Sequence, residues 1–246
     1  MLSEYEKIYH QVEENHWWNC SRRDLIYKLI HTWKMEKGTK ILDVGCSTGV
    51  LLDGLSKIKN IEVSGVDVSG KAINACHDKG LINTWVMEGE KLNFENSVFD
   101  IVIASDCLEH IKQDQKALKE WYRVLKNQGK LIILGPAFMA LWSEQDNLSN
   151  HFRRYHRNEL RLILKKTEFK IHRLSFWNTI LFIPILTIRF LFKLIKTETN
   201  MTYNQLQVPN PLINRVLKKL LIIENMILMK TNLPIGVSLF AICQKK

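Results

Sequence analysis

Short apolar runs and longer segments with helical periodicity alternate along the first 136 residues. The apolar runs have the length of buried strands and lie at 40–44, 63–67, at the start of 99–111, and at 129–136. Between them, residues 70–79 and 113–126 carry apolar side chains on one face of an expected helix. Strands that alternate with helices in this way predict a parallel sheet covered by helices.

A glycine-rich turn follows the first predicted strand, where the sequence reads Asp43-Val44-Gly45-Cys46-Ser47-Thr48-Gly49. Glycines at such a turn let the backbone approach a ligand, and the helix that follows presents unpaired N–H groups. The second strand ends in Asp67, where an acid in an α/β nucleotide site can accept hydrogen bonds from ribose hydroxyls. The first half of the chain is therefore expected to bind a cofactor that contains adenosine.

The spacing of the glycines argues against a dinucleotide. That fingerprint needs Gly-x-Gly-x-x-Gly, whereas Ser47 and Val50 stand at two of these positions. Asp43 would also repel a diphosphate and suits a cationic ligand. Asp43, Gly45 and Gly49 resemble motif I of the class I S-adenosylmethionine-dependent methyltransferases, acid-x-Gly-x-Gly-x-Gly, with Ser47 in place of the middle glycine.

The resemblance continues along the chain. Glu88 matches the acid after the third strand, although that family usually has Asp there, and 99–111 and 129–136 resemble the fourth and fifth strands. The family's cofactor is S-adenosylmethionine, and S-adenosylhomocysteine is its product. The resemblance implies cofactor contacts at Asp43, Gly45, Cys46, Gly49, Asp67, Val68, Glu88, Gly89 and Asp106.

The implied roles differ along this set. Asp43 would place the methionine amino group, Asp67 would hold the ribose and Glu88 the adenine edge. Asp106 would lie beside the methionine end, at the end of the fourth strand.

The implied architecture is a single α/β, Rossmann-like domain with a seven-stranded, mostly parallel sheet and an antiparallel last strand. By analogy with the family, 169–177 and 237–244 are expected to form the sixth and seventh strands. The domain would divide into an N-terminal helical lid (1–36), a cofactor-binding core (37–136), a substrate loop with a helix and the sixth strand (137–177), a basic and apolar helical insertion (178–236) and the last strand (237–246).

Two segments are expected to contact the acceptor. The N-terminal segment contains Trp17 and Trp18, which either cover the cleft or anchor their helix in the core. The polar, aromatic and basic loop 141–156 leaves the carboxyl end of a central strand, where α/β sheets place ligands. In it, Arg153 and Arg154 could clamp a carboxylate or phosphate, beside Tyr155.

For a hydroxyl acceptor the first candidate base is His110, after the fourth strand, and His151 and His156 in the basic loop are the runners-up. A helix-start role for His110 stays open. We expect no metal site, because the sequence shows no His, Asp or Glu cluster at coordinating spacing.

The formal net charge of +10 is unevenly distributed. Residues 1–149 contain 18 Lys/Arg and 21 Asp/Glu, and residues 150–246 contain 17 Lys/Arg and 4 Asp/Glu. The basic half suggests an anionic partner, namely a membrane surface, a phosphorylated substrate or nucleic acid, or simply solvated helix faces. Within it, 180–193 and 212–230 are apolar and basic, and are expected to lie in a membrane interface, form a homodimer seam or roof the pocket.

Scattered cysteines and a polar N-terminus indicate a cytoplasmic protein, or one peripheral at the inner face of the membrane. The leading hypothesis is methyl transfer to a small-molecule or lipid- or glycan-linked, anionic acceptor. The alternatives are an RNA methyltransferase, for which no base-flipping tetrad or RNA-binding module is found, a nicotinamide oxidoreductase, and a non-catalytic membrane-surface protein on the same fold.

Overall fold

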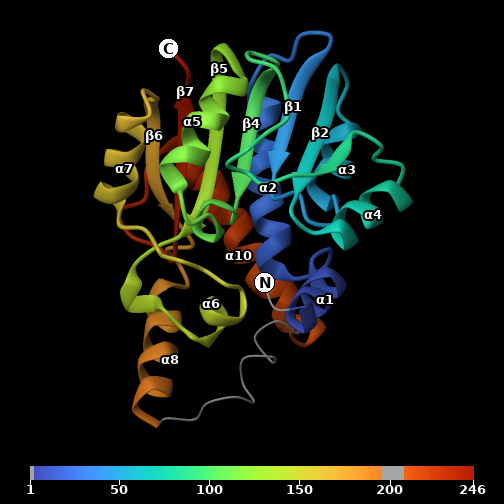
Figure 1. Ribbon diagram of the computed structural model, residues 1–246. Coiled ribbons are helices and arrows are strands. Elements are labelled where there is room, and N and C mark those ends of the chain that lie inside the picture. Colours follow the sequence, from blue (N-terminus) through green and yellow to red (C-terminus); the bar gives the residue numbers. More distant parts are fainter. Residues whose placement is uncertain (1–2, 196–207) are drawn as a thin grey trace.

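The computed structural model describes residues 3–195 and 208–246, and within them the strands form one seven-stranded sheet of order β3-β2-β1-β4-β5-β7-β6 (Figure 1). The strands are β1 (Thr39–Val44), β2 (Ile61–Asp67), β3 (Thr84–Val86), β4 (Phe99–Ser105), β5 (Leu125–Pro136), β6 (Lys170–Trp177) and β7 (Ser238–Gln244). β1 to β5 pair in parallel, and β7 runs antiparallel to both β5 and β6. The expected sheet and its antiparallel last strand are confirmed.

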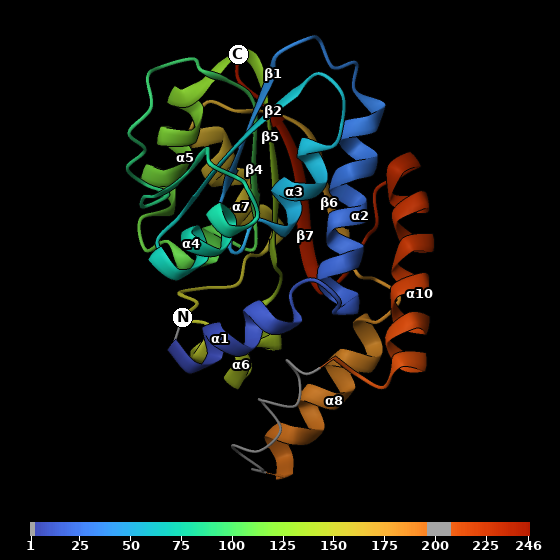
Figure 2. The same ribbon diagram turned by 90° about the vertical axis from the view of Figure 1, so that its right-hand side faces the viewer.

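Helices cover both faces of this sheet, as Figure 2 shows. The described helices are α1 (Ser3–Val12), α2 (Trp17–Thr32), α3 (Val50–Ser56), α4 (Gly70–Asp78), α5 (Asp114–Val124), α6 (Glu144–Leu148), α7 (Arg157–Lys166), α8 (Phe182–Ile195) and α10 (Pro211–Lys230), with short 3-10 turns η1 (Leu108–His110) and η2 (Met139–Leu141). α5 and α7 pack on one face, and α2, α3 and α10 on the other.

The central strand β1 illustrates why the sequence forms a buried parallel sheet. Ile41 faces the core beneath α2 and α3, and its neighbour Leu42 faces the opposite core beneath α5. Both side chains are fully buried. A strand covered on both faces needs apolar side chains in both directions, so it reads as an uninterrupted apolar run.

The fifth strand is longer than its apolar run predicts. It begins at Leu125, which pairs with Phe99 across a register shift, whereas the prediction began at 129. Residues 126–128 are polar and partly exposed, so hydrophobic pattern alone does not detect them.

The insertion between β6 and β7 supplies α8 and α10. α10 packs along α2, where the buried Asn225 side chain donates to the Ser21 carbonyl and accepts from the indole N–H of Trp177. α8 extends below the sheet beside α6 (Figure 1). None of the helices in 3–195 and 208–246 combines the length and hydropathy that a membrane span requires.

Candidate cofactor and acceptor site

A cavity of about 940 Å³ opens at the carboxyl ends of the parallel strands. Its floor comes from the turns after β1, β2 and β4, and its cover from α1, the start of α2, the loop at 145–154 and α8. Ligands in open α/β sheets bind at this edge. Of the residues predicted to bind cofactor or acceptor, the cavity is lined by Gly45, Asp67, Val68, Gly89, Asp106, His110, His151, Trp17, Trp18 and Arg154.

The glycine-rich turn has the backbone that its motif predicts. Gly45 and Gly49 both adopt positive φ (78° and 75°), and so does Ser47 at the middle position (φ 48°). Ser47 therefore keeps the left-handed conformation that glycine adopts most readily. Its backbone N–H donates to the Asp67 carboxylate at 3.0 Å, which joins the turn to the end of β2.

Asp67 lies at the end of β2 and lines the cavity. Its other carboxylate oxygen accepts from the Ser69 backbone N–H at 2.9 Å. Burial raises its pKa, and the two backbone donors oppose that rise. A carboxylate has lone pairs beyond these two bonds, so it can still accept from a ribose hydroxyl.

The N-terminal segment contributes a carboxylate that the sequence did not single out. Glu13, after α1, accepts hydrogen bonds from the hydroxyls of Ser47 at 2.8 Å and Thr48 at 2.9 Å, and it is only 7% exposed. Glu6 on α1 likewise accepts from the Ser69 hydroxyl. The lid is thus hydrogen-bonded to the two turns that would hold the cofactor.

Asp43 lies behind the turn, within β1, and is 3% exposed. Its pKa is raised to about 8, mainly by burial and in part by the negative charges of Glu13 and Asp67. A cation bound at the turn would stabilise the ionised form of this group. Asp43 does not itself line the cavity.

Across the cavity, Arg22 of α2 forms an ion pair with Asp106 at the end of β4. Asp106 also adopts a positive φ of 50° and donates its backbone N–H to the Leu134 carbonyl. The guanidinium could hold the methionine carboxylate of S-adenosylmethionine, while Asp106 could accept from its ammonium group.

Glu88, the predicted adenine contact, lies outside the cavity lining. Its side chain is exposed, whereas its neighbours Met87 and Gly89 line the cavity. Cys46 and Gly49 are also absent from the lining; Cys46 is buried against Leu52 and Cys76. These residues shape the turn from behind, and their assignment as ligand contacts stays a prediction.

Both arginines of the predicted clamp are already paired with carboxylates of the chain. Arg154 is 5% exposed and binds Asp146 through two nitrogens, at 2.8 and 3.0 Å. Arg153 binds Asp114 at 2.6 Å and lies outside the cavity lining. Tyr155 is buried and donates to Asp114 at 3.1 Å, so it anchors the loop.

The two tryptophans combine the roles that the sequence left open. The ring of Trp18 meets that of the buried Trp177 edge-on, with centroids 5.0 Å apart, and Trp17 meets Trp18 at 5.6 Å. Both also line the cavity. They anchor α2 and present aromatic surface to the pocket.

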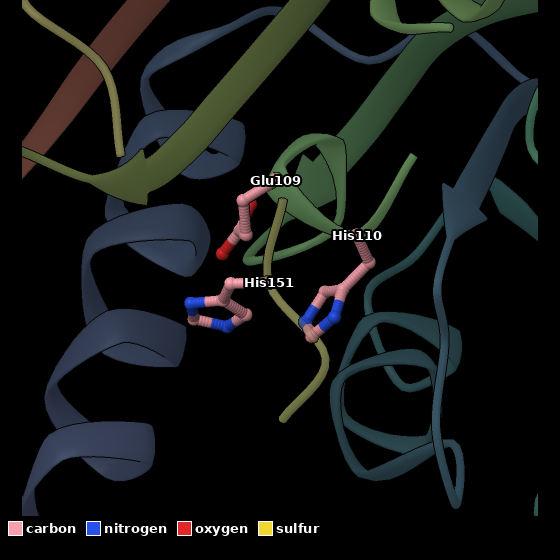
Figure 3. A group of neighbouring side chains, drawn as sticks. All are labelled: Glu109, His110 and His151. Atoms are coloured by element: carbon pink, nitrogen blue, oxygen red, sulfur yellow. The ribbon is translucent and has the colours of Figure 1, made fainter. Parts of the chain in front are cut away.

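The two predicted bases lie together in the cavity wall, with Glu109 beside them (Figure 3). The His110 and His151 rings meet edge-on with centroids 4.5 Å apart. The pKa of His110 is lowered to about 3, mainly by burial and in part by the nearby His151. His110 is thus a neutral imidazole and a weak base at neutral pH.

Glu109 and Asp146 are the principal residues of this end that sequence reasoning missed. Glu109 immediately precedes a candidate base, but nothing in the sequence indicates that its side chain is fully buried. Asp146 reads as one of several polar loop residues. Only the folded loop brings it to His151 and Arg154.

Comparison with known proteins agrees with this geometry. Residues 42–133 match the family model described as a methyltransferase domain. The ubiquinone/menaquinone biosynthesis C-methyltransferase UbiE of Neisseria gonorrhoeae is 34% identical over 112 residues, which cover 43% of this chain and 46% of that protein. The 2-methyl-6-phytyl-1,4-hydroquinone methyltransferase 1 of Oryza sativa is 29% identical over 139 residues, 54% of this chain and 41% of the relative. The chain thus spans less than half the length of these relatives.

Solved structures share the fold across most of the chain. The phosphoethanolamine N-methyltransferase 2 of Haemonchus contortus in complex with S-adenosyl-L-methionine superposes with a TM-score of 0.62 at 19% identity, covering 90% of this chain and 52% of that one. The [4+2]-cyclase SpnF superposes with a TM-score of 0.58 at 18% identity, covering 90% and 81%. Since a cyclase shares it, the fold alone does not establish methyl transfer.

The matched segment contains the Asp43–Gly49 turn, Asp67 and Asp106, and the sheet has the seven mostly parallel strands and the antiparallel last strand that the resemblance implies. Residues 42–133 therefore match a methyltransferase domain, and the chain has the fold of the class I S-adenosylmethionine-dependent methyltransferases, whose cofactor is S-adenosylmethionine.

Proposed function

We propose that the protein transfers the methyl group of S-adenosylmethionine to a small-molecule acceptor bound under the N-terminal lid. The observation that carries this proposal is the continuity of the cavity. One space of about 940 Å³ is lined by Gly45 and Asp67, which would hold the cofactor, and also by His110 and His151. A donor and an acceptor can therefore lie in the same enclosed space.

The reaction needs alignment more than activation of the donor. The acceptor atom attacks the methyl carbon as the carbon–sulfur bond breaks, and the electron pair of that bond stays on sulfur, which becomes the thioether of S-adenosylhomocysteine. An acceptor hydroxyl would lose its proton to a base or to water. The chain's contribution is to hold the reacting atoms in line and to exclude water.

We further propose that the acceptor is linked to a lipid. Apolar and aromatic side chains, among them Trp17, Trp18 and Ile185, line the cavity near the origin of α8. Along α8, Ile183, Phe190 and Leu191 are exposed. The names of the two sequence relatives describe quinone biosynthesis and a phytyl hydroquinone, which supports an acceptor with a polar ring and an apolar chain.

The test has two stages. S-adenosylhomocysteine should bind with a one-to-one stoichiometry in calorimetry. The protein is then incubated with methyl-labelled S-adenosylmethionine and a lysate of its source cells, and the label is partitioned between organic and aqueous phases. Label in the organic phase is expected. Label in aqueous metabolites or RNA would reject the lipid-linked acceptor, and no transfer of label would contradict the activity.

A further inference from the structure

The carboxylate of Glu109 is fully buried and accepts no hydrogen bond from the described residues. Its side chain is 0% exposed, and no donor in 3–195 or 208–246 reaches either of its oxygens within hydrogen-bond distance. Its neighbours in the cavity wall are satisfied: Asp106 pairs with Arg22, and Asp146 with Arg154. An unpaired buried carboxylate is costly, so this group points to a ligand that brings positive charge or a donor.

Two imidazoles share the space that this carboxylate faces. Figure 3 shows Glu109 and His110 on the turn after β4, with His151 approaching from the loop after α6. One nitrogen or oxygen of each side chain lies within 4.8 Å of the others. Both Glu109 and the two histidines line the cavity, so a ligand bound among them would be accessible to an acceptor.

Each imidazole is oriented from outside the cluster. Nδ1 of His151 lies 2.8 Å from Asp146 Oδ1, and Asp146 is itself fixed by Arg154. With its proton on Nδ1, His151 presents an unprotonated Nε2. His110 is held by the backbone of Ser149 and Asn150 in the same loop. A carboxylate or carbonyl behind each histidine is the arrangement that orients metal ligands in proteins.

The sequence led us to expect no metal site, but the fold brings these three side chains together. We propose that Glu109, His110 and His151 bind a divalent first-row transition metal such as Zn²⁺ or Mn²⁺. Two imidazoles and one carboxylate are donors that suit these ions better than Ca²⁺ or Mg²⁺, and they leave coordination positions open. Ligand atoms around tetrahedral zinc are roughly 3.3 Å apart, given metal–ligand bonds of about 2.0 Å. Binding therefore requires the loop 149–152 to move toward η1. The two segments are already joined, because the Phe152 N–H donates to the Glu109 carbonyl at 2.8 Å.

The three proposed ligands line the same cavity as Gly45 of the turn that would hold the cofactor. If the proposed methyl transfer is correct, on which this part rests, the ion holds a hydroxyl or phenolic oxygen of the acceptor and favours its deprotonated form. The metal would then select acceptors that carry such an oxygen at or beside the methylated atom.

The first measurement is of metal content, without cofactor or acceptor. Untagged protein is stripped with a chelator, dialysed against Zn²⁺, Mn²⁺ or Mg²⁺, and analysed by mass spectrometry. One Zn²⁺ or Mn²⁺ per chain is expected. Affinity should fall at least tenfold in Glu109→Gln and His151→Asn, while Glu95→Gln and His172→Asn, at sites outside the cavity lining, should bind like the wild type.

A second measurement separates this proposal from a folding defect and from the methyl-transfer proposal. S-adenosylhomocysteine affinity, measured by calorimetry, should stay within about threefold in all four variants. Wild-type protein that binds no Zn²⁺ or Mn²⁺, or cluster variants that bind as much as the controls, would overturn the metal site. Loss of methyl transfer with intact metal binding would instead count against the proposed function alone.

Discussion

The carboxylate of Glu13 accepts a hydrogen bond of 2.8 Å from the hydroxyl of Ser47, which stands where the family motif has its middle glycine. The same oxygen accepts from Thr48. The departure from glycine therefore has a structural consequence, because it gives the cofactor turn a hydroxyl that ties it to the N-terminal lid.

Removing the hydrogen bonds that Glu13 accepts should make the N-terminal segment open more often. Hydrogen bonds to a buried charge contribute about 1.5 to 3 kcal/mol, so Glu13→Gln should speed cleavage of the N-terminal segment in limited proteolysis about tenfold. Ser47→Ala, which removes one of the two donors, should have a smaller effect. Equal proteolysis of the wild type and both variants would show that other contacts hold the lid.

Substitution of Asp67 tests the ribose contact. Asp67→Ala should weaken S-adenosylhomocysteine binding at least tenfold in calorimetry, because it removes an acceptor for the ribose and releases the Ser47 and Ser69 N–H groups. Asp67→Asn keeps one acceptor oxygen and should lose less affinity. An unchanged affinity in Asp67→Ala would remove this residue from the binding site.

Asp43 should make the stability of the ligand-free protein depend on pH. Its pKa is raised from 3.8 to about 8 in the folded state, so the folded chain retains a proton that the unfolded chain loses. This group's contribution is greatest below pH 4 and declines as the pH rises to about 8, by up to about 1.4 kcal/mol per pH unit. Urea unfolding of Asp43→Asn between pH 5 and 9 should therefore show a flatter profile than the wild type. Parallel profiles would contradict the raised pKa.

Substitutions of the neighbouring Arg153 and Arg154 should differ sharply in their effect on the free energy of unfolding. Arg154→Ala leaves Asp146 buried without its principal partner and should lower the free energy of unfolding by about 3 to 5 kcal/mol. Arg153 and Asp114 are partly exposed, with side chains 30% and 12% exposed, so Arg153→Ala should cost about 1 kcal/mol or less. Urea denaturation of both variants checks this difference, and similar losses would reject it.

The insertion should bind anionic membranes if the acceptor is lipid-linked. Exposed Leu212, Ile213 and Val216 lie at the start of α10, close to Arg215 and Lys219. Basic and apolar side chains on one helix suit a negatively charged interface. The wild type should sediment with vesicles containing phosphatidylglycerol, and Arg215→Glu with Lys219→Glu should release it. Failure of the wild type to bind would reject the membrane proposal.

Several parts of this protein follow from the sequence alone. Buried parallel strands must be apolar in both directions, and glycines must stand where φ is positive, so β1, β2, β4 and the turn from Gly45 to Gly49 are visible in the residue pattern. Asp67 and Asp106 can also be located from the sequence, because Asp67 is the last residue of β2 and Asp106 comes directly after β4. Together with the resemblance to the methyltransferase family that these residues carry, they predicted the fold and the cofactor.

The surroundings of His110 and His151 were decided only by the tertiary structure. Burial of Glu109, the pairing of Arg154 with Asp146 and the approach of His151 to His110 join the turn after β4 to a loop about 40 residues further along. The link between Glu13 and Ser47 is of the same kind. Contacts between distant polar residues have no periodicity, because each depends on one side chain meeting another in the folded chain rather than on a repeating face of a helix or strand.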